Sequence, residues 1–113
     1  PLSSNSARRV ENRIAGMDCN PYLGIAVSLA CGYLGIKNEI RPSKQFRGDA
    51  YEGAEEIPRG LRSALDLFEE ATPLHKILGT EFCRVYSIVK RAEHDEFLQV
   101  ISPWEREHLL LNV

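Results

Sequence analysis

The sequence lacks a long apolar run and an excess of one charge, and each absence argues against a class of protein. Its most apolar stretch, residues 22–36, is shorter than the roughly 20 residues that a membrane-spanning helix needs. The 16 acidic and 14 basic residues are interleaved, whereas a nucleic-acid-binding surface collects basic side chains. We therefore expect a protein that binds neither a membrane nor a nucleic acid.

Cysteine is also scarce, and its arrangement argues against two kinds of structural support. Cys19, Cys31 and Cys83 are odd in number and lack the paired short spacings of zinc sites and the density of a disulfide scaffold. We interpret them as free thiols of a cytoplasmic protein. The first residue is not Met and residues 1–6 carry no secretion signal, so we expect the chain to begin inside a longer protein.

The segment from Arg8 to Ile14 alternates between two kinds of side chain. One side carries charge and the other does not; the charged side consists of Arg9, Glu11 and Arg13, and the other of Val10, Asn12 and Ile14. A period of two predicts a β-strand. Because a lone strand cannot satisfy its edges, we expect its partner strands to lie upstream.

Residues 20–36 carry the signals of a helix. Asn20 can cap the free backbone donors at its start, and Pro21 suits the first helical position. Small residues recur every fourth position along this helix, at Gly24, Ser28 and Gly32. One stripe therefore lacks bulk, and another helix or sheet could approach its backbone closely.

The remainder of the chain predicts a surface excursion and four more helices. Residues 37–56 are polar, rich in glycine and without a sustained period. These four helices are expected to start at Pro58, at Thr72, near Thr80 and at Ser102-Pro103. Gly79 is expected to end the helix that starts at Thr72. The apolar stripe of the helix that starts near Thr80 reaches Ile101. The fold class is thus α+β, mostly α, with one strand followed by about five helices in a single segment, residues 1–113.

Arg9, Glu11 and Arg13 are the candidate site residues. On a strand they would point the same way and stand roughly 6.5 to 7 Å apart, a spacing that suits a ligand between them. Glu11 can hold a hard divalent cation, and a guanidinium on each flank can grip phosphate or carboxylate oxygens. The alternative is an exposed row of ion pairs, each worth under about 1 kcal/mol.

The surrounding residues resemble the glutamine synthetase family. The run Arg9-Val10-Glu11-Asn12-Arg13, followed by Asp18-Cys19-Asn20-Pro21-Tyr22-Leu23, is similar in order and spacing to that family's Arg-x-Glu-x-Arg strand and Asn-Pro-Tyr-Leu helix start. The likeness continues through residues 58–61, 78–79 and 104–107. It covers nearly the whole chain and identifies it as the C-terminal part of a catalytic domain.

The resemblance implies a function and a role for each charged residue. It implies an ATP-dependent ligase that joins ammonia or an amine to the γ-carboxyl of glutamate through γ-glutamyl phosphate. Arg9 would contact the ATP phosphates, Glu11 would bind Mg²⁺ or Mn²⁺, and Arg13 would hold glutamate or its phosphorylated intermediate. It also implies a ring-like homo-oligomer of the full-length protein. The family's other metal-binding residues have no counterpart here, so these 113 residues alone are expected to be inactive.

Two departures leave alternatives open. Cys19 stands where the family commonly has Ala, and we expect it to be a small buried residue rather than a nucleophile. The ending at residues 104–107 and the insertion at residues 42–57 favour a γ-glutamylpolyamine synthetase or an uncharacterised homologue over an ammonia-using enzyme. The rival hypothesis is a non-catalytic helical module that kept the family's scaffold and now binds a partner.

Overall fold

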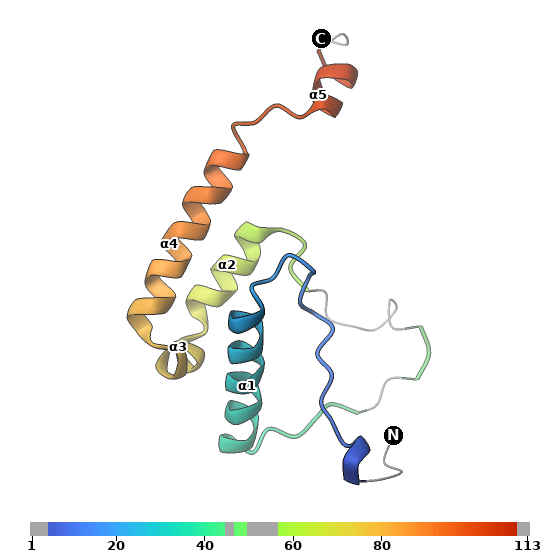
Figure 1. Ribbon diagram of the computed structural model, residues 1–113, viewed down its shortest axis with the longest axis vertical. Helices are drawn as coiled ribbons and strands as arrows, with labels where there is room; N and C mark the ends of the chain where they lie inside the picture. Colours follow the sequence, from blue (N-terminus) through green and yellow to red (C-terminus); the bar gives the residue numbers. More distant parts are fainter. Residues whose placement is uncertain (1–4, 45–46, 50–56, 111–113) are drawn as a thin grey trace. The chain divides into compact units, whose positions relative to one another are not determined.

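The computed structural model describes residues 5–44, 47–49 and 57–110. This part of the chain is mostly helical (Figure 1): a 3₁₀ turn η1 at Asn5–Ala7 precedes α1 (Pro21–Lys37), α2 (Leu61–Glu70), α3 (Thr72–Leu78), α4 (Thr80–Phe97) and α5 (Pro103–His108). None of these helices combines the length and the apolar character needed to cross a bilayer. The chain forms two compact units, Pro1–Arg41 and Pro42–Val113.

Helix α1 dominates the first unit, and its start confirms the predicted cap. The Asn20 side chain accepts hydrogen bonds from the backbone N–H groups of Tyr22, at 3.0 Å, and Leu23, at 3.3 Å. Pro21 takes the first helical position, where its missing N–H leaves no bond unmade. The helix therefore begins where the sequence predicts.

The end of α1 is closed by backbone bonds. The N–H of Ile40 donates to the carbonyl of Gly35 at 2.9 Å, and that of Glu39 donates to Ile36 at 3.2 Å. This is the Schellman pattern, which places one residue in the left-handed region. Glu39 takes that place with φ 51°, although glycine is the usual occupant. The chain turns away from the helix axis here as a result.

The strand predicted over residues 8–14 is not formed. Residues 8–14 run alongside α1 without belonging to a strand or helix (Figure 1). A strand exists only when a second strand accepts and donates its ladder hydrogen bonds, and the described remainder of this unit supplies a helix instead. The predicted strand is therefore not seen in the described residues, whereas the mostly helical character and the five helices of the prediction are confirmed.

The link between the units agrees with the predicted excursion where it is described. Residues 38–44 and 47–49 contain no helix or strand. The other residues of the predicted excursion, 45–46 and 50–56, lie outside the described ranges. Helix α2 then starts at Leu61, later than the predicted start at Pro58, because Gly60 has an extended backbone with φ −128° and ψ 150°.

The second unit is built on α2 and α4, which pack against each other. Leu65 of α2 is buried together with Cys83 and Ser87 of α4. The ring of Phe68 lies 5.0 Å from His75 and 5.8 Å from Tyr86 between centroids. The small buried residues of α4 allow α2 to come close, and the rings fill the space at the side.

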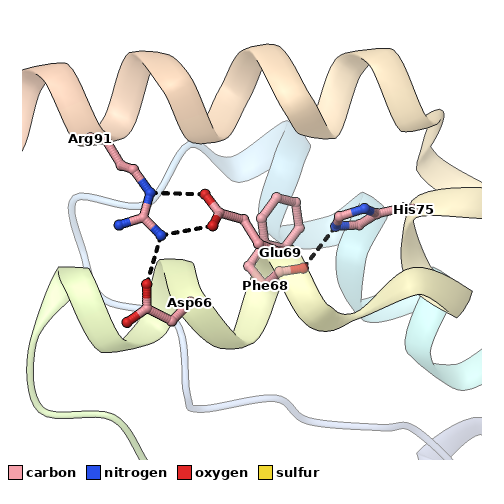
Figure 2. A network of polar contacts seen from close by, with 5 residues as sticks. All are labelled: Asp66, Phe68, Glu69, His75 and Arg91. Atoms are coloured by element: carbon pink, nitrogen blue, oxygen red, sulfur yellow. Dashed lines mark hydrogen bonds and ion pairs between the residues drawn. The ribbon is translucent and has the colours of Figure 1, made fainter.

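An arginine fork joins α2 to α4 (Figure 2). Nε and Nη2 of Arg91 donate to the two carboxylate oxygens of Glu69 at 2.9 and 2.8 Å, and Nη2 also donates to Asp66 at 2.6 Å. Bonding to Glu69 and then Asp66 raises the pKa of Arg91, and bonding to Arg91 lowers the pKa of Glu69. The paired geometry is one that a lysine cannot reproduce.

Single residues form the joints around α3. Ala71 ends α2 and also precedes α3, while Gly79 ends α3 and precedes α4. Gly79 has φ 97°, a conformation in which a side chain would be strained. His75 adds a further tie across the first joint, because its Nε2–H donates to the carbonyl of Phe68 at 2.7 Å (Figure 2).

Helix α4 ends at Phe97, so the apolar stripe predicted to reach Ile101 leaves the helix before its end. The N–H groups of Gln99 and Val100 donate three residues back rather than four, which closes turns instead of a helix.

The capping box predicted for α5 is confirmed: Ser102 Oγ accepts from the N–H of Glu105 at 3.2 Å, and the Glu105 carboxylate accepts from the N–H of Ser102 at 2.7 Å.

Replacing Arg91 by lysine should lower the urea midpoint of unfolding. Arg91→Lys keeps the charge but loses the paired bonds to Glu69. Arg84→Lys is a matched control, since among the described residues Arg84 pairs only within α4, with Glu81, and ties no second helix to it. Urea titrations followed by circular dichroism compare the two variants with the wild type. Equal effects of both substitutions would contradict a tie between helices.

The lowered pKa of Glu69 makes this tie sensitive to acid. A carboxyl whose pKa is lower in the folded state than its ordinary value of 4.5 stabilises the fold above that pH, and the contribution is lost as the pH falls below it. Glu69→Gln should therefore flatten the fall of the melting temperature between about pH 6 and about pH 3. Glu70→Gln, on the neighbouring exposed residue, should leave the slope of the wild type.

Candidate functional site

An open groove lies between the first segment and α1. Its volume is about 780 Å³, and its lining includes Val10 and Asn12 on one side and the small-residue stripe of Gly24, Ser28 and Gly32 on the other. A segment thus lies along the stripe across this groove, whereas the spacing of the small residues predicted room for the close approach of a helix or sheet. The approaching segment is irregular rather than a strand.

Asn12 anchors the first segment on α1. Its Nδ2–H donates to Ser28 Oγ at 2.9 Å, and its Oδ1 accepts from the N–H of Ile14 at 3.0 Å. The Ser28 hydroxyl in turn donates to the carbonyl of Gly24 at 2.8 Å. Asn12 therefore ties the segment to α1 at one point, while Val10 on the same side of the segment is 97% exposed.

The predicted site residues do not line this groove. Glu11 Oε1 accepts from Nε of Arg13 at 2.8 Å, and the Glu11 and Arg13 side chains are 54% and 82% exposed. Arg9 is exposed and makes no side-chain hydrogen bond or ion pair with another described residue. The structure brings together two of the three residues, and the roles of all three stay predictions.

Glu11 can supply one ligand to a divalent cation. Within the described ranges, no three histidine, cysteine or acidic side chains gather in a way that could hold a metal. Magnesium is commonly held by one or two protein carboxylates, with waters and substrate phosphates completing the shell. An exposed carboxylate such as Glu11 fits that use, as a single ligand beside a nucleotide.

Cys19 is exposed, so the expectation of a buried residue is wrong. It lies in the turn before α1, where its thiol contacts the carbonyl of Asn20 at 3.4 Å and no described segment covers it. The buried thiol is Cys83 instead, and burial raises its pKa. The position of Cys19 in the family motif gave no information about its exposure.

Sequence reasoning missed the Arg91 fork. Asp66 and Glu69 lie three residues apart, which places them on one face of a helix, and this spacing is a visible sign of a shared partner. The partner itself is 22 residues beyond Glu69 along the chain. Only the packing of α2 on α4 brings it near, so the pair of acids could be found from the sequence but Arg91 could not.

The comparisons with known proteins confirm the family that the sequence resembles. A family model described as glutamine synthetase, catalytic domain, matches residues 1–109. The helical chain with an Arg-x-Glu-x-Arg segment before α1 thus matches a catalytic-domain family over nearly its whole length. The chain belongs to the glutamine synthetase family.

Its relatives include enzymes named for different amines. It is 38% identical to a glutamate–isopropylamine ligase of a Pseudomonas species, over 91% of this chain and 23% of that one. It is 36% identical to gamma-glutamylputrescine synthetase of Escherichia coli, over 99% and 24%. It is 32% identical to glutamine synthetase of Methanocaldococcus jannaschii, over 98% and 26%.

The chain spans about a quarter of the length of these relatives. No solved structure matches it significantly.

Two glycines of α1 should respond differently to alanine. A Cβ at Gly24 would lie 2.9 Å from Sγ of Cys19, whereas a Cβ at Gly32 meets nothing within 4 Å. Gly32→Ala should therefore stabilise the chain against urea by up to about 1 kcal/mol, the difference in helix propensity, and Gly24→Ala should gain less. Repeating Gly24→Ala in a Cys19→Ala background should restore the gain. An equal gain from both single substitutions would contradict the close contact.

Proposed function

We propose that this chain is the C-terminal catalytic segment of an ATP-dependent ligase that forms an amide between the γ-carboxyl of glutamate and ammonia or an amine. Membership of the glutamine synthetase family supports this, and so do relatives named as glutamate–amine ligases. The whole protein would use γ-glutamyl phosphate as its intermediate and assemble as a ring. These 113 residues alone would be inactive.

One observation carries the assignment of the site. Glu11 and Arg13 lie next to each other, exposed, on a segment whose other side is anchored to α1 through Asn12. A carboxylate and a guanidinium that lie side by side can bind a cation and an anion at adjacent positions. Transfer of a phosphoryl group to a carboxylate needs both, because charge builds up on the transferred oxygens.

Each charged residue has a distinct role in this proposal. Glu11 would hold a divalent cation, Mg²⁺ or Mn²⁺, which neutralises phosphate charge when bound. Arg9 would grip the phosphates of ATP, and Arg13 would hold the carboxylate of glutamate or its phosphorylated form by paired hydrogen bonds. The three residues then position the reactants, while the remaining ligands come from outside the described residues.

The second candidate is a non-catalytic helical module. One observation favours it: Glu11 and Arg13 neutralise each other and are well exposed, as in an ordinary surface ion pair.

The identity of the amine is a separate question. Two of the relatives are named for isopropylamine and putrescine, which supports testing amines beside ammonia.

The test is glutamate-dependent release of ADP by the complete gene product, with ammonia and a panel of amines. Glu11→Ala should lower kcat/KM by about 10² or more, since a ligand that balances transition-state charge is lost. Arg9→Ala should mainly raise the KM for ATP, and Arg13→Ala the KM for glutamate.

Arg8→Ala is the matched control, because Arg8 is an exposed arginine of the same segment outside the motif. It should keep the activity of the wild type. Full activity of Glu11→Ala would remove the ligase assignment of this site, and a complete gene product inactive with every amine would favour the non-catalytic module.

A further inference from the structure

Glu11 and Arg13 occupy each other's binding groups. The Nε–H of Arg13 donates to Oε1 of Glu11 over 2.8 Å, which engages the Nε side of the guanidinium, one of the two edges by which it can bind a carboxylate in pairs. The carboxylate that would hold a cation is neutralised by the same contact. Neither side chain makes an ion pair with another described residue.

We infer that this ion pair is an internal latch that makes the cation and the acidic substrate bind cooperatively. The inference rests on the proposed roles of Glu11 and Arg13. A cation held by Glu11 would release Arg13, and a carboxylate held by Arg13 would release Glu11. Arg13 competes with the cation for Glu11, and Glu11 competes with the carboxylate of the substrate for Arg13. Each ligand therefore strengthens the binding of the other by the same factor, because the coupling is a property of the equilibrium.

The support of the latch lets it open without unfolding the segment. Asn12 lies between the two charged residues, and its side chain is bonded to Ser28 on α1 and to the N–H of Ile14. Neither bond involves Glu11 or Arg13. Breaking the ion pair therefore moves two exposed side chains and leaves the anchored backbone in place.

The exposure of the pair sets the size of the effect. The Arg13 side chain is 82% exposed and that of Glu11 54%, so water screens their attraction. Exposed pairs of this kind change an equilibrium by a factor of about five at most. We expect each ligand to tighten the binding of the other by up to about fivefold. The latch changes the affinity for both ligands by the same factor and blocks the binding of neither.

The experiment measures binding rather than turnover, with the complete gene product and without nucleotide. Calorimetry gives the Kd of glutamate with and without saturating Mg²⁺, and nitrogen–proton NMR follows the Nε–H of Arg13 as Mg²⁺ is added alone. In the wild type, Mg²⁺ should lower the Kd up to about fivefold and shift the Arg13 signal. Glu11→Gln should bind glutamate more tightly without Mg²⁺ and lose the response to it.

Glu39→Gln is the matched control, because it removes one negative charge from an exposed residue of the same unit outside the ion pair. It should behave as the wild type. If glutamate binds equally with and without Mg²⁺, or Mg²⁺ alone leaves the Arg13 signal in place, the latch is wrong while the proposed function stands. If no substitution of Glu11 or Arg13 alters the binding of either ligand, the latch and the proposed site both fail.

Discussion

The hydrogen bond from Asn12 to Ser28 is the constraint on which the candidate site depends. It fixes which side of the first segment meets α1. With Asn12 bonded to α1, Glu11 and Arg13 lie outside the groove and pair with each other. Gly24 and Gly32, on either side of Ser28, leave the helix surface open enough for this approach. The hydrogen bond between the uncharged side chains of Asn12 and Ser28 thus positions the segment that carries the charged residues.

The starts of α1 and α5 were predictable from the sequence because their causes are local. Asn20 with Pro21, and Ser102 with Glu105, satisfy backbone donors within three residues, so the sequence contains both partners. The strand over residues 8–14 failed for the opposite reason, since a ladder needs a partner from elsewhere. The end of α4 was also missed, because apolar periodicity continues through Ile101 after the backbone has left the helix.

The family was predictable from the sequence, whereas the geometry of the candidate site was not, and the roles of its residues stay predictions. The order of Arg9, Glu11 and Arg13 before the Asn20 cap carried the family, and the family match over residues 1–109 agrees with it. Which residues pair is a matter of side-chain position, and the mutual pairing of Glu11 and Arg13 is not visible in their spacing. The exposure of Cys19 likewise depends on what packs over a turn, which a motif does not record.

Helix α3 acts as a rigid spacer between the two helices that Arg91 joins. One-residue joints, Ala71 and Gly79, lie at its two ends, so little slack exists to absorb a change in its length. Each residue of an α-helix turns the chain by about 100°. A natural variant with one residue inserted in α3 would rotate α4 by that angle and carry its guanidinium away from both acids. Among homologues, insertions are therefore expected to avoid residues 72–78 and to collect in the links on either side of the α2–α4 pair.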